Sequence, residues 1–181
     1  MLTEIVEKKT VLDYEKLPEG APYQLIDGEL IMNPVPHFFH QELVMRLSTK
    51  FFMFVDKKQL GKVVASPVDV YLSETDVYQP DIVYISKDRL SIVVDGRIKG
   101  APDLVVEVLS PSTGFYDLSH KKHVYESSGV KEYWVVYPRE EIIEVQENVG
   151  GEFQQIARVK RQGNVASKVL QGFSVSLADI F

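Results

Sequence analysis

The sequence contains no cysteine and no long hydrophobic run, and each absence removes a class of protein. Without cysteine, the 181 residues cannot form disulfides, thiolate metal sites, iron–sulfur clusters or a cysteine nucleophile. No apolar run approaches the roughly 20 residues that a membrane-spanning helix needs. The first 20 residues are charged throughout, unlike a secretory signal. We therefore expect a soluble cytoplasmic enzyme or binding protein with no membrane association.

Positive charge is also scarce: the chain has 20 lysines and arginines and 26 acidic residues, which gives a net charge of −6. An acidic chain is a poor general binder of nucleic acid. The negative charge is concentrated, however: residues 1–30 carry seven acids and three lysines, and residues 139–152 carry five glutamates and one arginine. The total therefore does not exclude a nucleic-acid substrate, and it predicts salt-sensitive binding on one face. The basic segment from Arg158 to Lys168 fits a phosphate contact and a solvated hairpin end equally well.

The order of the predicted elements indicates a single α/β (α+β) domain over residues 1–181. Residues 1–20 form an N-terminal arm, and Asp27-Gly28 between two apolar runs predicts a hairpin. Apolar residues at three- and four-residue steps predict a helix from His40 to near Gly61. The other expected elements are a strand over 63–72 broken near Pro67, strands over 82–85, 104–109 and 133–137, a helix over 117–128, a hairpin over 142–159 and a strand over 173–177.

Three ionisable residues lie where an apolar core would not place them. Asp81 opens one apolar strand, Glu107 lies inside another, and Lys121 is on the following helix. A carboxylate inside a central strand is costly unless it is paired or metal-bound. Two such carboxylates and a backbone carbonyl could hold a divalent cation, and a lysine could act on water or phosphate. The alternative stays open that Glu107 lies on the face of an edge strand and that Asp81 caps the turn after Pro80.

Several stretches resemble the Uma-two family of restriction endonucleases. They are Val-Glu-Val-Leu-Ser-Pro-Ser from Val106, Gly-Val-Lys-Glu-Tyr-Trp from Gly129, Tyr23 to Leu30, His40, Pro80-Asp81-Ile82, and Asp117 with Lys121 and Tyr125. The resemblance covers the chain from about Asp13 to Phe181. It implies the PD-(D/E)xK restriction-endonuclease-like fold: a mixed central sheet flanked by helices, here with an N-terminal hairpin and a C-terminal β-hairpin extension. It also implies Mg²⁺ or Mn²⁺ as cofactor and DNA as substrate.

The resemblance assigns roles residue by residue. Asp81 and Glu107 would ligate the metal, with the backbone carbonyl of Val108 as a third ligand. The superfamily's lysine two residues after the glutamate is Leu109 here, which makes Lys121 the candidate and leaves its neighbour Lys122 open. Glu29 would be the acidic residue that supports the site from an N-terminal element. His40, Asp117 and Tyr125 would be supporting residues, and no nucleic-acid-binding residues are assigned.

Other polar and aromatic residues carry weaker hypotheses. The histidine pairs at 37 and 40 and at 120 and 123 are too few for a zinc site of four ligands. Asp103 could be the motif aspartate, but about 13 Å of extended strand separates it from Glu107, so we expect it to cap the strand. For Asp69, which precedes Val70 on an earlier strand, an outer-sphere or structural role and a catalytic role are both open. The aromatic strand around Trp134 is expected in the core or a dimer interface, with base stacking the weaker alternative.

The sequence thus supports a metal-dependent endonuclease that hydrolyses DNA phosphodiester bonds. Two alternatives remain: an inactive nuclease-fold protein that binds nucleic acid or protein, kept open by Leu109, and a hydrolase of another phosphate ester. The aromatic strands and the superfamily habit of cutting two strands with two subunits suggest a homodimer.

Overall fold

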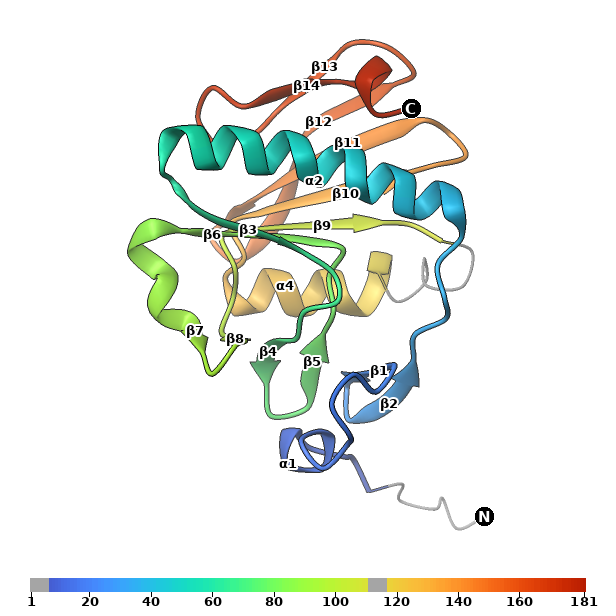
Figure 1. Ribbon diagram of the computed structural model, residues 1–181, viewed down its shortest axis with the longest axis vertical. Coiled ribbons are helices and arrows are strands. Elements are labelled where there is room, and N and C mark those ends of the chain that lie inside the picture. The colour runs from blue at the N-terminus through green and yellow to red at the C-terminus, as the bar shows by residue number, and fades with distance from the viewer. Residues whose placement is uncertain (1–6, 111–116) are drawn as a thin grey trace.

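The computed structural model describes residues 7–110 and 117–181, except for the side chains of residues 117 and 118 (Figure 1). Its helices and helical turns are α1 (Val11–Tyr14), α2 (Phe38–Lys58), η1 (Lys87–Ile92), the π-helical turn η2 (Asp117–Lys121), α4 (Lys122–Ser128) and η3 (Leu177–Asp179). Its strands are β1 (Tyr23–Ile26), β2 (Glu29–Met32), β3 (Gly61–Ala65), β4 (Val70–Ser73), β5 (Asp76–Tyr78), β6 (Ile82–Ser86), β7 (Val93–Val94), β8 (Arg97–Lys99), β9 (Leu104–Val108), β10 (Glu132–Tyr137), β11 (Ile142–Val149), β12 (Glu152–Lys160), β13 (Asn164–Ala166) and β14 (Ser174–Ser176).

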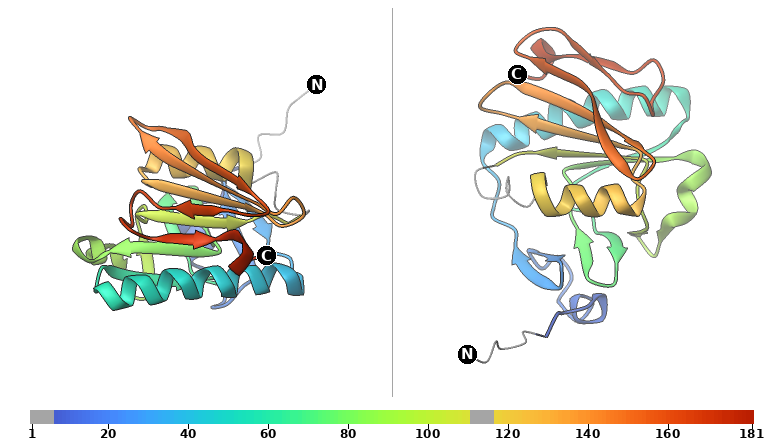
Figure 2. Two further views of the ribbon diagram at one scale, coloured as in Figure 1. Left: turned by 90° about the horizontal axis from the view of Figure 1, so that it is seen from above. Right: turned by 180° about the vertical axis from the view of Figure 1, so that it is seen from behind.

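A mixed central sheet with the strand order β12-β11-β10-β9-β6-β3 organises the molecule. β9 and β10 run parallel, and the other neighbouring strands run antiparallel. α2 covers one face of this sheet and α4 lies on the other, so the expected mixed sheet flanked by helices is confirmed (Figures 1 and 2). The predicted hairpin over 142–159 is β11 and β12, which complete this sheet rather than extend from it.

The alternation of side chains along β9 decides which face each residue serves. Val106 and Val108 pack in the cluster beneath α2, whereas Val105 packs with Tyr125 of α4 on the opposite face. Because successive residues of a strand point to opposite faces, Glu107 lies on the α4 face. All five residues of β9 are buried, so the prediction of a central strand covered on both faces is confirmed.

The predicted helix after His40 is α2, and its spacing of apolar residues is confirmed. Its buried residues are Leu43, Val44, Leu47, Phe51 and Val55. It ends at Lys58, and the following residue, Gln59, takes a left-handed conformation. Among the described residues, no helix is both long and apolar enough to cross a membrane.

The aromatic strand β10 belongs to the core. Tyr133 and Trp134 are fully buried, and the Trp134 ring contacts Phe51 at 5.2 Å between centroids. The indole N–H of Trp134 donates to Glu132 Oε1 at 2.6 Å. The core alternative for this strand is therefore correct, and the strand offers no exposed surface for a base or a second subunit.

A second sheet, which the sequence did not predict as a unit, has the order β2-β1-β5-β4-β8-β7. The single strand expected over 63–72 is wrong: β3 joins the central sheet through β6, whereas β4 pairs with β5 and β8 in the second sheet. The predicted hairpin β1–β2 is confirmed and pairs with β5 through Leu25 and Val77. Tyr14 of α1 is buried and donates to Asp69 Oδ1 at 3.0 Å, so the described part of the arm packs on this sheet.

Candidate active site

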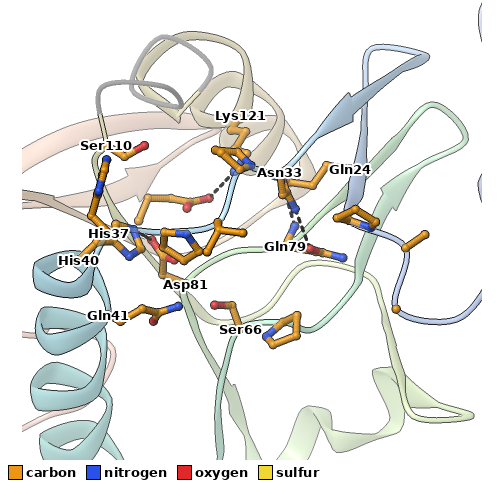
Figure 3. Close-up of a pocket in the computed structure, with 18 residues that line it drawn as sticks. Gln24, Asn33, His37, His40, Gln41, Ser66, Gln79, Asp81, Ser110 and Lys121 are labelled. Carbon is orange, nitrogen blue, oxygen red and sulfur yellow. Dashed lines mark hydrogen bonds and ion pairs between the residues drawn. The ribbon is translucent and has the colours of Figure 1, made fainter.

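A cavity of about 590 Å³ opens at the end of the central sheet where β9 finishes and β6 begins (Figure 3). Its lining comes from four separate segments, residues 20–24, 33–41, 66–67 and 79–81, together with Glu107, Ser110 and Lys121. The start of α2, the β1–β2 hairpin and the ends of β3, β6 and β9 therefore meet here. Four of the sequence-predicted site residues line this one cavity: His40, Asp81, Glu107 and Lys121.

Glu107 is held by two groups from the helical segment after β9. Lys121 Nζ donates to Glu107 Oε1 at 3.1 Å, and the Tyr125 hydroxyl donates to the same oxygen at 2.7 Å. The side chains of Lys121 and Glu107 are only 3% and 4% exposed. Residues four apart on a helix share one face, which lets Lys121 and Tyr125 reach the same carboxylate. A buried carboxylate paired in this way avoids much of the cost of desolvation.

Asp81 is tied to the backbone directly after Glu107. The Val108 N–H donates to Asp81 Oδ2 at 2.7 Å, because antiparallel pairing of Ile82 with Val106 brings the start of β6 beside the end of β9. His40 of α2 places its Nε2 3.4 Å from the same Asp81 oxygen. The main chain of Val108 thus lies at the Asp81 carboxylate.

Three amide side chains, which sequence reasoning missed, form another wall of the cavity. Asn33 Nδ2 donates to Gln79 Oε1 at 2.7 Å, and the Gln79 N–H donates to Gln24 Oε1 at 2.8 Å. Gln79 also donates to Asp69 Oδ1 at 2.8 Å. In Figure 3 these amides lie across the pocket from His40. The available signal was Gln79, which stands two residues before Asp81.

A second buried carboxylate, that of Asp76, connects β5 with the helical turn that carries Lys121. Asp76 accepts from the Tyr78 hydroxyl at 2.6 Å and from the Asp27 N–H at 3.0 Å, and His120 Nε2 lies 3.5 Å away. Burial alone raises the pKa of Asp76, but these donors outweigh it and hold the pKa below its usual value. The same burial and the bond to Asp76 raise the pKa of Tyr78. This arrangement fixes β5 against the helical turn that carries Lys121.

The structure places other predicted site residues away from the cavity. Glu29 is exposed at the turn of the β1–β2 hairpin and is not part of the lining, so the structure does not bring it to the site. Lys122 is half-buried and does not line the cavity either. The side chain of Asp117 lies outside the described residues. Leu109, which replaces the superfamily's lysine, is half-buried against the apolar cluster on the α4 face.

Asp103 serves the opposite end of β9, as expected for a strand cap. Its buried carboxylate accepts from Lys131 Nζ at 2.6 Å and from the Ser86 N–H at 2.7 Å, with Arg89 Nη1 at 3.1 Å. Burial alone raises its pKa, but Lys131, Ser86 and Arg89 outweigh it and hold the pKa below its usual value. Asp103 is therefore a structural anchor and does not join Asp81 and Glu107.

The donors in the cavity suit a hard divalent cation better than zinc. Asp81 and Glu107 supply carboxylate oxygens, which Mg²⁺ and Mn²⁺ prefer. Across the parts of the chain that the structure describes, no three histidine or acidic side chains converge as a ready ligand set. His37 and His40 line the cavity, His120 faces Asp76, and His123 is 76% exposed.

Comparison with protein families and solved structures shows what this chain is similar to. A model of the Uma2 family, described as "Putative restriction endonuclease", matches residues 11–178. The crystal structure of a protein from Anabaena variabilis ATCC 29413, described as "a putative nuclease belonging to DUF820", has a TM-score of 0.78 and 20% sequence identity. That similarity covers 95% of this chain and 97% of the other, and it shows a shared fold. No curated protein matches the chain.

Proposed function

Because this chain belongs to the Uma2 family, we propose that it is a metal-dependent endonuclease that hydrolyses DNA phosphodiester bonds. Membership of a family of restriction endonucleases supports a nuclease function. We propose the metal dependence, the DNA substrate and the roles of individual residues. We also propose that residues 1–181 form a single domain.

One observation carries the proposal: Lys121 and Glu107 are paired at 3.1 Å in the cavity that Asp81 also lines. A carboxylate and a lysine buried together at an open pocket are unusual for a purely structural pair, because burial is costly for both charges. Asp81 and Glu107, with the backbone carbonyl of Val108, would hold the cation. When bound, a divalent cation supplies positive charge against phosphate oxygens and lowers the pKa of a coordinated water.

The residues of the chain perform the remaining tasks. Hydrolysis forms a bond between a water oxygen and phosphorus and breaks the bond to the leaving oxygen, while negative charge builds on the phosphoryl oxygens. The Lys121 ammonium would stabilise that charge, and its burial strengthens the effect. Tyr125 holds Glu107 in place through its 2.7 Å hydrogen bond. His40 and the Val108 N–H fix the orientation of Asp81.

Replacement of the carboxylates tests the proposal. We expect the wild-type chain to cleave a panel of DNA substrates in Mg²⁺ or Mn²⁺, and we expect Asp81→Asn and Glu107→Gln to abolish cleavage. Glu29→Gln is the matched control, because Glu29 is a carboxylate outside the cavity. Calorimetry with Mn²⁺ should show binding to the wild type and none to Glu107→Gln. The proposal fails if the chain cleaves no DNA and binds no cation that Glu107→Gln removes.

The same geometry bears on the two alternatives. A non-catalytic binding module is open because Leu109 replaces the expected lysine, and catalysis requires the Lys121 amine to lie within reach of both carboxylates. The 3.1 Å contact between Lys121 and Glu107 meets this condition for one of the two and supports catalysis. Adding RNA and small phosphate esters to the substrate panel separates a DNA endonuclease from a hydrolase of another phosphate ester.

A further inference from the structure

The segment that connects β2 to α2 is uncharged and exposes apolar side chains. Residues 30–41 contain no lysine, arginine, aspartate or glutamate, although 25% of the whole chain is charged. Within this segment, Val35 is 92% exposed and Phe38 is 85% exposed. Met32 and Phe39 are exposed as well. Exposed apolar residues that gather in this way mark interaction sites on soluble proteins.

This segment forms one rim of the candidate active site. Residues 33–37 line the cavity, as do His40 and Gln41 at the start of α2. Phe38 stands three residues before Gln41, so the two side chains are neighbours on the helix surface. The exposed Phe38 ring therefore lies at the edge of the cavity. In Figure 3, His37 and His40 lie across the pocket from the wall of three amide side chains.

The amide wall offers hydrogen-bond donors to the cavity. Gln79 Nε2 donates to Asp69 Oδ1 at 2.8 Å, and because an ionised carboxylate only accepts, this bond fixes the orientation of the Gln79 amide. The Gln79 oxygen then accepts from Asn33 Nδ2 at 2.7 Å, and Gln24 Nε2 donates in turn to Asn33 Oδ1. These contacts use one of the two hydrogens on each nitrogen of Gln24 and Asn33. The second hydrogen of each can serve a ligand that has acceptor atoms.

The size and the charge of the cavity favour a single nucleotide over a duplex. Its volume of about 590 Å³ lies in the range of small-molecule pockets, about 300–1,000 Å³. Glu107 and Lys121 are almost completely buried, so a phosphodiester has to enter the cavity to reach them. In the part of the chain that the structure describes, Lys121 is the only lysine or arginine of the lining, and it is paired with Glu107. Duplex binding relies on several phosphate contacts with such residues, which this lining does not supply.

We propose that the cavity and its apolar rim bind unpaired bases, which makes single-stranded DNA the substrate of this site. The inference rests on the proposed nuclease function, since it names the form of DNA that the site takes. One base enters the cavity, where its edge accepts hydrogen bonds from Asn33 and Gln24. That edge is free only when the base is unpaired. A neighbouring base stacks on the exposed Phe38 ring, a contact that any base can make.

Binding measured in EDTA tests the inference in the absence of cleavage. The probe is a fluorescein-labelled oligothymidylate of twelve nucleotides, followed by fluorescence anisotropy, and it is compared with its blunt duplex with oligodeoxyadenylate. We expect the single strand to bind at least about tenfold more tightly than the duplex. Phe38→Ala should weaken single-strand binding about tenfold, the effect of losing one stacked base. Phe52→Ala is the matched control, because Phe52 is another exposed phenylalanine of α2, about 21 Å further along the helix. It should leave the affinity unchanged, and both variants should melt like the wild type.

A tryptophan at the rim reports the stacking contact itself. The natural chain contains one tryptophan, Trp134, which is fully buried. Phe38→Trp therefore adds an exposed indole, and the single strand should quench its fluorescence whereas the duplex should not. Phe52→Trp should be quenched by neither. Raising the salt from 50 to 200 mM should weaken single-strand binding by less than about tenfold, because 6–10 phosphate contacts would cost about 10³–10⁵ over the same range.

Cleavage in Mg²⁺ distinguishes this inference from the proposed function. We expect a gapped duplex to be cut within its gap and an intact duplex to stay uncut. If DNA of neither form is cleaved, the proposed function fails, and the binding measurements alone decide whether unpaired bases occupy the cavity. A duplex that is bound or cleaved as well as the single strand overturns the inference and leaves the nuclease function in place. Wild-type affinity in Phe38→Ala, or a thousandfold loss of binding over the stated salt range, overturns it as well.

Discussion

Replacement of Lys121 by methionine gives the sharpest test of the buried pair at the candidate site. The substitution keeps the length of the side chain and removes its charge. The Glu107 carboxylate stays buried, and of the two donors to Oε1 described above it keeps the Tyr125 hydroxyl. Breaking a buried pair by removing one partner costs about 3–5 kcal/mol. Because Tyr125 still donates to the carboxylate and the cavity admits water, we expect about 3 kcal/mol.

Urea denaturation followed by circular dichroism measures this loss as a lower transition midpoint at an unchanged slope. Lys122→Met is the matched control: the same substitution one residue further, at a half-buried lysine outside the cavity. It should change the free energy of unfolding by no more than about 0.5 kcal/mol. Equal costs for the two variants would refute the assignment of Lys121 as the partner of Glu107.

The same variant reports on cation binding. A divalent cation held by Asp81 and Glu107 would replace the positive charge that the substitution removes. Mg²⁺ should therefore raise the transition midpoint of Lys121→Met more than that of the wild type. An ion that binds only the folded state, present at 100 times its dissociation constant, raises the free energy of unfolding by about 2.7 kcal/mol. If Mg²⁺ leaves both midpoints unchanged at high millimolar concentration, the carboxylates do not hold it.

Three further predictions address individual contacts. Tyr125→Phe removes a hydrogen bond to the buried Glu107 carboxylate and should lower the free energy of unfolding by about 1.5–3 kcal/mol in urea; a neutral result would mean that the carboxylate is satisfied without it. Asp103→Asn should cost about 2 kcal/mol at pH 7. The folded pKa of Asp103 is lower than its unfolded value of 3.8, so the stabilisation from its carboxylate is present above pH 3.8 and is lost as the pH falls through the folded pKa. The melting temperatures of the wild type and the variant should therefore converge in acid. A gap that stays constant with pH would contradict this role for the carboxylate. Gly61→Ala would place a Cβ 2.1 Å from the Ile85 carbonyl oxygen, at a φ of +149°. Thermal melts should show that the free energy of unfolding falls by about 1–3 kcal/mol. Unchanged melting would exclude this close approach.

Local patterns in the sequence were enough to predict several features of the site. The nearly continuous apolar run over β9 places Glu107 inside a central strand, and the four-residue step from Lys121 to Tyr125 places both side chains on one helical face. The hairpin at Asp27-Gly28 and the helix α2 likewise follow from turn chemistry and from the spacing of apolar residues. These features depend on neighbours within a few positions, which is the range over which sequence periodicity is informative.

The convergence of these residues depended on the tertiary structure. The contact between Asp81 and the Val108 N–H exists because β6 pairs antiparallel with β9, and that register is set by packing between segments 27 residues apart. The main-chain N–H of Gln79 reaches the side-chain oxygen of Gln24 only because the second sheet brings β1 beside β5, which no local pattern records. Glu29 shows the converse: its hairpin was predicted correctly, yet its exposed side chain is not part of the cavity lining.

The sequence by itself determined which residues are chemically capable: two carboxylates at apolar strands, a lysine on the following helix, and no cysteine. The tertiary structure decided which of them share one cavity. The physical reason is that composition and spacing fix what a side chain can do and which face of its own element it occupies. Its partners are fixed by long-range packing and strand register, because these bring together segments that are distant in the chain.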